Sequence, residues 1–405
     1  MLTIIPITAI SSGLGIFIPL YILYLKGSIL DIGLAFAIYN LVSVPSSLFW
    51  GNITDRYGRS KPFIIFSILL TLPVLIVLGF FHGIFNVFFN YALFAIIATA
   101  ASPAINILVI GTKRSKTLPK YFSRYSIFGL LGSVIAFVFG ASIAINNPEV
   151  YIYFLMFFNL ISLFLALFLI KDIKRTEKEI NKEKIHNRLF PLLYSLTSLP
   201  SAMISTNTIV RMMTAVKKIK KRKVFQLLGA IVLFNLAYYI FNTSYVPYLN
   251  YLGLSYNNIF LINLMNVLAQ VLVFIVIIKL KNKLKVGRIY VIGVIYRSLG
   301  YVVAGAAAFL PAFFFPANVV AYIICGFSYA LWNLSSSVLL YDMIRGKREG
   351  YYIGMWTSLL GASAVIGSIL SSIISLFFGF QITFVVATII TISSGALFHK
   401  KFTSV

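Results

Sequence analysis

The stretch from Gly51 to Lys61, which reads Gly-Asn-Ile-Thr-Asp-Arg-Tyr-Gly-Arg-Ser-Lys, lies between two long apolar segments. It gathers one acid, three bases and two glycines into what we expect to be a tight polar turn. Glycine permits close backbone approach and a sharp reversal, and basic side chains are well placed at the level of lipid headgroups. The stretch therefore predicts two membrane-spanning helices that are joined on one side of a bilayer.

The composition of the 405-residue chain also indicates a membrane protein. Hydrophobic residues make up 60% of the chain and charged residues 11%, and the mean hydropathy is +0.96. A water-soluble core cannot hide this much apolar surface. The apolar runs recur at lengths of about 20 residues, enough to cross a bilayer as a helix. They are continuous and do not alternate, which excludes a transmembrane β-barrel.

These runs predict an all-α integral membrane protein with twelve transmembrane helices in two pseudo-symmetric six-helix bundles. The predicted spans are residues 2–25, 30–50, 62–81, 87–110, 126–145, 151–170, 224–249, 258–278, 289–309, 318–340, 351–376 and 381–398. The predicted domains are an N-terminal bundle, a cytoplasmic basic linker and a C-terminal bundle, at residues 1–171, 172–223 and 224–405.

The distribution of charge predicts the orientation of the chain. The net charge of +25, from 34 Lys and Arg against 9 Asp and Glu, would suggest nucleic acid as the partner of a soluble protein. Here the loops on the side of residues 51–61 collect the bases, whereas the opposite side keeps only Lys26. Cytoplasmic loops retain Lys and Arg, so we expect both termini in the cytoplasm, a location in the cell membrane and no nucleic acid partner. The basic linker lies either in solvent or on the anionic inner membrane surface.

The spacing of Gly51, Asp55, Arg56, Gly58 and Arg59 resembles the loop motif between the second and third helices of major facilitator superfamily transporters. The resemblance implies two bundles that rock about a central site. It also implies that Asp55 faces the start of the eleventh helix and holds the cytoplasmic ends of the bundles together. A carboxylate near a helix N-terminus gains about 0.3 to 1 kcal/mol, which agrees with this gating role. The alternative interpretation is a topology anchor, for which the charges alone suffice.

The sequence departs from the pattern of that family at two places. Family members often end the fourth helix with an acid that pairs with the last arginine of the motif, whereas residues 110–113 here read Ile-Gly-Thr-Lys. Arg59 therefore lacks its usual partner. The Gly-Pro pattern that antiporters of the family often carry in the fifth helix is also missing, which argues against proton-driven efflux.

A weak internal repeat supports two related halves. The Leu-Leu-Gly of residues 130–132, in the fifth predicted span, recurs at residues 359–361 in the eleventh. The same sequence offset separates the Gly-Arg of residues 58–59 from that of residues 287–288. Duplicated halves of this kind are common in transporters.

Small and weakly polar residues in the first, second and fifth spans predict close helix packing. In the fifth span, Gly132, Ala136 and Gly140 follow one another at a spacing of four. Such residues let helices approach closely and form hydrogen bonds across the contact. We assign the same packing role to a further group in the first two spans, namely Ser11, Ser12, Gly13, Gly15, Tyr39, Asn40, Ser43, Pro45, Ser46 and Ser47.

Amide and aromatic side chains mark a candidate substrate path. Polar groups that face lipid are costly, so those inside spans should face a partner helix or a water-filled cavity. Helical spacing puts four of them on one face of the seventh span and three on one face of the eighth. The candidates are Asn235, Tyr238, Tyr239, Asn242, Asn263, Asn266 and Gln270, together with Trp332 and Asn333 in the tenth span. The alternative for each is hydrogen bonding between helices without a ligand.

Arg297 is the one base well inside a predicted span, about 12 Å beyond the start of the ninth helix. A charge within the membrane is a functional candidate by default. Three interpretations remain open. Arg297 contacts an anionic group of the substrate, extends to the cytoplasmic surface, or pairs with Asp342.

The sequence gives no sign of a metal site, a bound cofactor or an enzyme. The single cysteine, Cys325, forms no CxxC motif, and neither HExxH nor a phosphate-binding loop is present. No acid or histidine lies centrally in a span, so a proton relay is not visible, although coupling to a proton or another ion stays open. These features argue against a polytopic membrane enzyme.

We therefore predict a secondary active or facilitative transporter that moves a small organic solute by alternating access. The alternatives are a proton-coupled multidrug efflux pump and, further away, a membrane receptor or assembly subunit. Receptors and subunits do not explain the motif in residues 51–61 or the repeated halves. The expected partners are a small-molecule solute and membrane lipids, and we expect a monomer.

Overall fold

The computed structural model of the chain describes residues 3–57, 60–110, 118–143, 148–170, 222–279, 286–344 and 349–402. Within these residues every regular element is a helix. The first six are α1 Ile4–Tyr24, α2 Ile29–Tyr57, α3 Lys61–Phe80, α4 Ile84–Ile110, α5 Leu118–Ile143 and α6 Pro148–Leu169. The others are α10 Arg222–Tyr251, α11 Tyr256–Lys279, α12 Val286–Ala307, the short 3-10 helix η2 Pro311–Phe313, α13 Phe314–Ile344 and α14 Glu349–Phe402.

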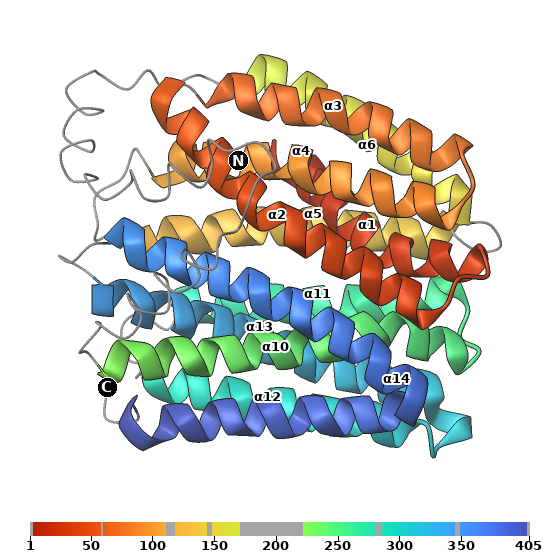
Figure 1. Cartoon of the computed structure of the whole chain (residues 1–405), viewed down its shortest axis with the longest axis vertical. Helices are drawn as coiled ribbons and strands as arrows, with labels where there is room; N and C mark the ends of the chain where they lie inside the picture. The colour runs from red at the N-terminus through yellow and green to blue at the C-terminus, as the bar shows by residue number, and fades with distance from the viewer. Residues whose placement is uncertain are drawn as a thin grey trace, which may run out of the picture.

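Eleven of the described helices are long and apolar enough to cross a membrane, and the last of them contains two crossings. The apolar part of α14, Trp356–Phe398, has 43 residues, about twice the length that a bilayer needs. It is broken at Gly379, where φ is 83° and ψ is 169°. Figure 1 shows α14 running to one end of the molecule and returning. The predicted all-helical fold with twelve crossings is thereby confirmed.

The turn that was predicted from residues 51–61 is shorter than expected. Helix α2 continues through the polar residues to Tyr57, and α3 begins at Lys61. The prediction that Gly51 lies in the turn is therefore wrong, and among the described residues nothing beyond the adjoining backbone of α2 comes within 4 Å of the position that a Cβ at Gly51 would occupy. Polar residues outside the hydrocarbon layer can continue a helix because water or headgroups satisfy their side chains. Hydropathy therefore marks where the membrane ends and not where the helix ends.

The helices form two bundles that lie against each other, α1 to α6 in one and α10 to α14 in the other (Figure 1). In the N-terminal bundle α1 packs on α5 and α6, while α4 packs on α2 and α3. In the C-terminal bundle α10 packs on α14, and α13 packs on α11 and α12. The bundles meet where α2 contacts α14 and α5 contacts α11. The exact domain boundaries stay a prediction, because nearly all of the predicted linker at residues 172–223 lies outside the described residues.

At one end of the molecule, which we call the short-turn end, the bundles are packed tightly together. This end carries the turns at residues 25–28, 81–83 and 252–255. The ring centroids of Tyr151 and Phe260 lie 5.0 Å apart across the interface. This contact belongs to a layer of buried aromatic side chains: Phe17 packs on Tyr151, Phe137 packs on Phe260, and Tyr21, Tyr245 and Tyr248 are part of the same buried cluster. The interface is therefore closed at the short-turn end.

Sequence near the first turn explains its shape. Lys26 has a positive φ of 61°, and the backbone N–H of Ser28 donates to the Asp31 carboxylate at 2.7 Å. The Ser28 hydroxyl also donates to that carboxylate, at 2.8 Å, and accepts from the Asp31 N–H at 3.3 Å. This is a capping box, with the acid three residues after the serine. Asp31 therefore has a structural role at the start of α2.

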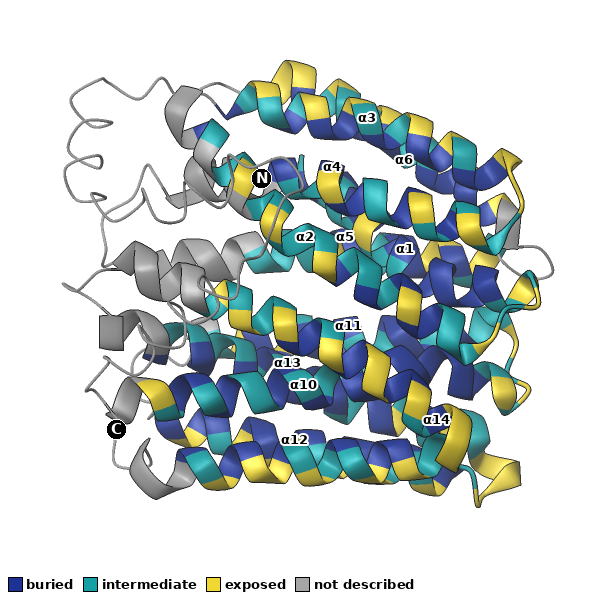
Figure 2. Ribbon diagram, in the orientation of Figure 1, coloured by how far each residue is buried: buried dark blue, intermediate teal, exposed yellow. Residues whose placement is uncertain are grey.

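The outer surface of the helices is apolar. Large exposed side chains lie on the helices at the periphery, among them Phe85 with 88% of its surface exposed and Phe168 with 70%. Figure 2 shows exposed positions recurring along α3 and along the returning half of α14, between buried ones. An apolar surface of this extent is the surface of a protein surrounded by lipid.

Candidate functional site

A cavity of about 360 Å³ lies between the two bundles, and we call it the interface cavity. Helices of both bundles line it, α1, α2, α4 and α5 on one side and α10, α11 and α13 on the other. Its described lining carries no charged side chain. The lining residues are Ser12, Gly15, Ile16, Phe36, Tyr39, Asn40, Tyr91, Leu130, Ser133, Phe137, Tyr238, Tyr239, Asn242, Thr243, Val246, Asn263, Asn266, Val267, Gln270 and Tyr322. The volume lies near the lower limit for sites that bind small molecules.

Helix α10 contributes an aromatic and amide wall to the cavity. Tyr238, Tyr239 and Asn242 all line it, as the helical spacing predicts. The rings of Tyr238 and Tyr239 meet edge to face with centroids 5.3 Å apart. On α13, the Tyr322 hydroxyl donates to Oδ1 of Asn242 at 3.3 Å. This wall therefore offers both ring faces and polar groups to a solute.

Helix α11 contributes three amides that hydrogen bonds hold in place. Nε2 of Gln270 donates to Oδ1 of Asn266 at 2.8 Å, and Nδ2 of Asn266 donates to the Tyr322 carbonyl at 2.8 Å. Nδ2 of Asn263 donates to the carbonyl of Ile259, one turn earlier, at 2.8 Å. The predicted face of α11 therefore does two things, because it lines the cavity and also binds α13. A preorganised amide binds a solute without first losing its own freedom of rotation.

The N-terminal bundle supplies the opposite wall with residues that the sequence suggested were packing residues. The ring centroids of Tyr39 and Tyr91 lie 4.5 Å apart in a stacked arrangement, and Asn40 lines the cavity beside them. The hydroxyl oxygens of Ser12 and Ser133 are 2.6 Å apart, so one donates to the other between α1 and α5. The sequence signal that could have found this wall is the spacing of Phe36, Tyr39 and Asn40, which puts them on one helical face.

Three candidates from the sequence lie away from the described lining of the interface cavity. Nδ2 of Asn235 donates to the Leu360 carbonyl at 2.9 Å and to the Ser363 hydroxyl at 2.7 Å, which places Asn235 between α10 and α14. The Trp332 ring stacks on Phe234 with centroids 4.5 Å apart. Asn333, next to Trp332, is also not among the lining residues. A substrate role for Asn235, Trp332 and Asn333 stays a prediction that this geometry does not favour.

Arg297 is buried inside the C-terminal bundle, with 1% of its surface exposed. Its Nε donates to the Tyr301 hydroxyl at 2.8 Å, and its Nη1 donates to the Cys325 carbonyl at 2.9 Å. The guanidinium carbon lies 4.8 Å from the ring centroid of Tyr238 and 5.0 Å from that of Tyr301. A cation over a ring in a desolvated site gains about 2 kcal/mol. The hypothesis that Arg297 extends to the membrane surface is therefore wrong, because its head group is held among aromatic rings.

The residues of the predicted gating motif are only partly described. Gly51 lies within α2, and Asp55 and Arg56 lie in its last turn. The side chains of Asp55 and Arg56 are outside the described part of the chain, as are Gly58 and Arg59 altogether. Pairing of Arg297 with Asp342 likewise involves a side chain that is not described. The gating role of the motif stays a prediction.

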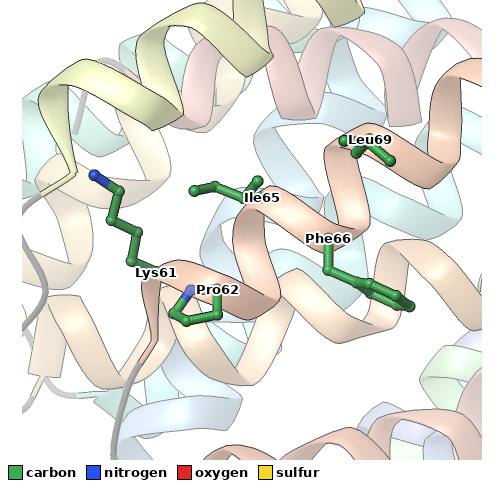
Figure 3. Close-up of a pocket in the computed structure, with 5 residues that line it drawn as sticks. All are labelled: Lys61, Pro62, Ile65, Phe66 and Leu69. Carbon is green, nitrogen blue, oxygen red and sulfur yellow. The ribbon is translucent and has the colours of Figure 1, made fainter.

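A second hollow, of about 430 Å³, lies at the start of α3 and is a less suitable solute site. Its lining residues are Lys61, Pro62, Ile65, Phe66 and Leu69, all from one helix (Figure 3). Lys61 points away from the others, and its Nζ donates to the Leu167 carbonyl of α6 at 2.7 Å. Phe66 and Leu69 are 41% and 52% exposed. This shallow apolar hollow lies on the outside of the protein, whereas the interface cavity lies between the bundles.

Two membrane-spanning bundles with a cavity of amide, hydroxyl and aromatic side chains at their interface have the architecture of a membrane carrier. The sequence matches the model of the Major Facilitator Superfamily over residues 1–339. The chain therefore belongs to this superfamily and is a transporter. No curated protein matches the sequence significantly.

Solved structures of transporters have the same fold. A POT family transporter in complex with a thioalcohol-conjugated peptide is 15% identical, with a TM-score of 0.72, and the match covers 99% of this chain and 96% of that one. The nucleoside transporter NupG is 13% identical, with a TM-score of 0.72 and coverage of 99% and 98%. A mutant of the peptide transporter POT in complex with sulfate is 14% identical, with a TM-score of 0.71 and coverage of 98% and 93%. At this level of identity the likeness concerns the fold alone.

Proposed function

We propose that the protein carries a small polar organic solute across the cell membrane by alternating access through the interface cavity. The observation that carries this proposal is the composition of the cavity wall, to which both bundles contribute. When two bundles rock against each other, a cavity between them opens first to one side and then to the other. The role we propose for this wall is to bind a solute, and we do not propose a reaction.

Two features support access from the end opposite the short-turn end. The aromatic layer around Tyr151 and Phe260 closes the short-turn end. On α1, which begins at the opposite end, the cavity lining reaches Ser12, in the half of the helix nearer that end. We infer that the opposite end faces the cytoplasm, with both termini, because the bases of the loops gather there.

The lining favours a solute that combines hydrogen-bonding groups with a flat or apolar body. Amides and hydroxyls can each donate and accept, and tyrosine rings present flat apolar faces. The solved structures with the same fold include a nucleoside transporter and a POT family transporter in complex with a peptide conjugate. Nucleosides and peptides both combine hydrogen-bonding groups with a flat or apolar body. We propose transport by a monomer in contact with membrane lipids. The uptake experiment described next also distinguishes coupling to a proton or another ion from facilitated diffusion.

Solute uptake by proteoliposomes that hold the purified protein tests the proposal. The panel contains nucleosides, dipeptides, amino acids, sugars, organic anions and drugs, each with and without an imposed pH gradient. We expect uptake of one class, and a Gln270→Ala variant should reduce it about tenfold, because the variant removes an amide from the cavity wall.

The matched control is Ser393→Ala, which removes an exposed hydroxyl that donates to the Ile389 carbonyl one turn earlier in α14. This variant should transport like the parent protein. Equal loss in the two variants, or a lack of flux with every class, would contradict the proposal. A pH gradient that accelerates uptake would identify proton coupling, and a gradient without effect would point to facilitated diffusion or to another ion.

A further inference from the structure

One buried charge lies directly behind the wall of the interface cavity. Arg297 is not itself a lining residue, but the Tyr238 ring that it contacts is. The Cys325 carbonyl that accepts from Arg297 lies one helical turn beyond Tyr322, which also lines the cavity. The Tyr238 side chain therefore contacts the guanidinium and also lines the cavity.

The hydrogen bonds of Arg297 are incomplete within the described residues. Its Nε and Nη1 have acceptors, whereas its Nη2, which carries two N–H donors, has none. No described carboxylate contacts the guanidinium, and its neighbours are the hydroxyl of Tyr301, a carbonyl and two rings. A buried charge without a counterion is costly, so proteins seldom keep one without a use for it.

The charge changes what the cavity can bind. A cation in a low-dielectric interior acts over several ångströms, and the cavity wall beyond Tyr238 carries no charge to oppose it. The cation also draws electron density from the Tyr238 ring, which makes the Tyr238 hydroxyl a stronger donor to an anion. Hydrogen bonds to ionised acceptors are the strong ones.

We propose that the interface cavity selects a small organic anion whose charged group binds near Tyr238, Asn242 and Tyr322 and is stabilised by the buried charge of Arg297. This inference rests on the proposed function, since it names the substrate class of the same cavity. Arg297 acts here as a specificity-determining residue. The aromatic faces of Tyr239, and of Tyr39 across the cavity, accommodate the body of the solute.

Binding of matched probes to the full-length purified protein in detergent tests this assignment. The probes are phenylacetate and its neutral amide, phenylacetamide, which share one shape, with phenyl phosphate as a second anion. We expect phenylacetate to bind about tenfold more tightly than the amide by equilibrium dialysis. Arg297→Gln should abolish this preference, whereas Arg297→Lys should largely keep it. Phenyl phosphate, compared with phenylacetate, distinguishes a phosphate ester from a carboxylate as the preferred anion.

Two further variants separate charge selection from general damage. Arg288→Gln removes an exposed charge from the start of the same helix and should leave the preference unchanged. Tyr238→Phe keeps the ring but removes the hydroxyl, so phenylacetate should bind several-fold more weakly while phenylacetamide changes by less than about twofold. This second test stands even where Arg297→Gln does not fold.

The inference is overturned by equal binding of the two probes, by binding of neither, or by a preference that survives Arg297→Gln. In each of these cases the proposed transport function stands as long as proteoliposomes take up a neutral solute. Failure of uptake with every solute contradicts the transport function itself, whatever the probes show.

Discussion

Single glycines decide how closely the helices of this protein approach one another. At Gly132 of α5, a Cβ would overlap the carbonyl oxygen of Ile5 in α1. Gly140 on the same helix faces the Phe260 ring of α11 in the other bundle. The small-residue face that the sequence predicted therefore contacts two different helices. Over the eight residues between the two glycines, the direction of the side-chain position rotates by about 80° beyond two full turns.

We predict that Gly132→Ala destabilises the protein and that Gly129→Ala does not. The added methyl at Gly132 has to displace backbone of α1, which costs about 1 to 3 kcal/mol. At Gly129 the nearest atom to a new Cβ is a methyl of Thr8 at 3.6 Å, an ordinary contact. Thermal unfolding in detergent should show a midpoint several degrees lower for the first variant only. Equal midpoints would mean that α1 and α5 are less closely packed than described.

The residues of the site were only partly predictable. Helical periodicity brings Tyr238, Tyr239 and Asn242 to one face of α10, and the structure puts that face on the cavity. It also puts Asn235 on the face, but Asn235 binds the neighbouring α14, since the approach of a second helix is not encoded in spacing. For the same reason the sequence predicts a packing role for Tyr39, whereas the structure places Tyr39 in the cavity wall. A polar residue inside a span shows that a partner exists, and only the packed structure shows which one.

At the scale of the elements, the last two crossings lie in α14, which is interrupted at Gly379. Its φ of 83° with a ψ of 169° belongs to a backbone region that is essentially open to glycine alone. The sequence predicted the interruption at about this point from the gap between spans 351–376 and 381–398. Hydropathy located the crossings well because a bilayer fixes their length. It placed the end of α2 too early because a helix can continue into water.

Gly379→Ala is expected to destabilise the reversal by about 1 to 3 kcal/mol. The control is Gly305→Ala in α12, where a new Cβ would meet only the Phe384 side chain, at 3.8 Å. Chemical denaturation in detergent, followed by tryptophan fluorescence, measures both free energies of unfolding. The reverse order of stability would show that the backbone at Gly379 is not held in its present conformation.

At the scale of the whole molecule, the two bundles are closed against each other at the short-turn end. Sequence alone does not reveal this closure. Apolar residues cover most faces of these helices, and hydropathy does not show whether an apolar face contacts lipid or another helix. Contacts between α2 and α14 contribute to the closure. A Cβ on Gly33 would overlap the side chain of Ser372 and lie 2.9 Å from the carbonyl oxygen of Ser368.

Gly33→Ala should therefore weaken the closed state and raise the population that is open at the short-turn end. A penalty of about 1.4 kcal/mol changes the ratio of the two states tenfold. The rate at which a membrane-impermeant maleimide labels a cysteine at Val246, a cavity residue with 6% exposure, reports this opening. Gly83→Ala, where nothing lies within 4 Å of a new Cβ, should leave the rate unchanged. Identical labelling rates in both variants would argue against closure through α2 and α14.

The central claim, that the bundles alternate about the interface cavity, is tested most directly by electron-electron double resonance between spin labels on opposite bundles. Replacing the single native cysteine, Cys325, by alanine provides the background. One label pair at Phe85 and Tyr251, both highly exposed, reports the short-turn end, and a second pair at Leu169 and Phe225 reports the opposite end. We expect a transported solute to change the two distances in opposite directions. Distances that stay the same at both ends, with a solute that the protein demonstrably transports, would contradict the account.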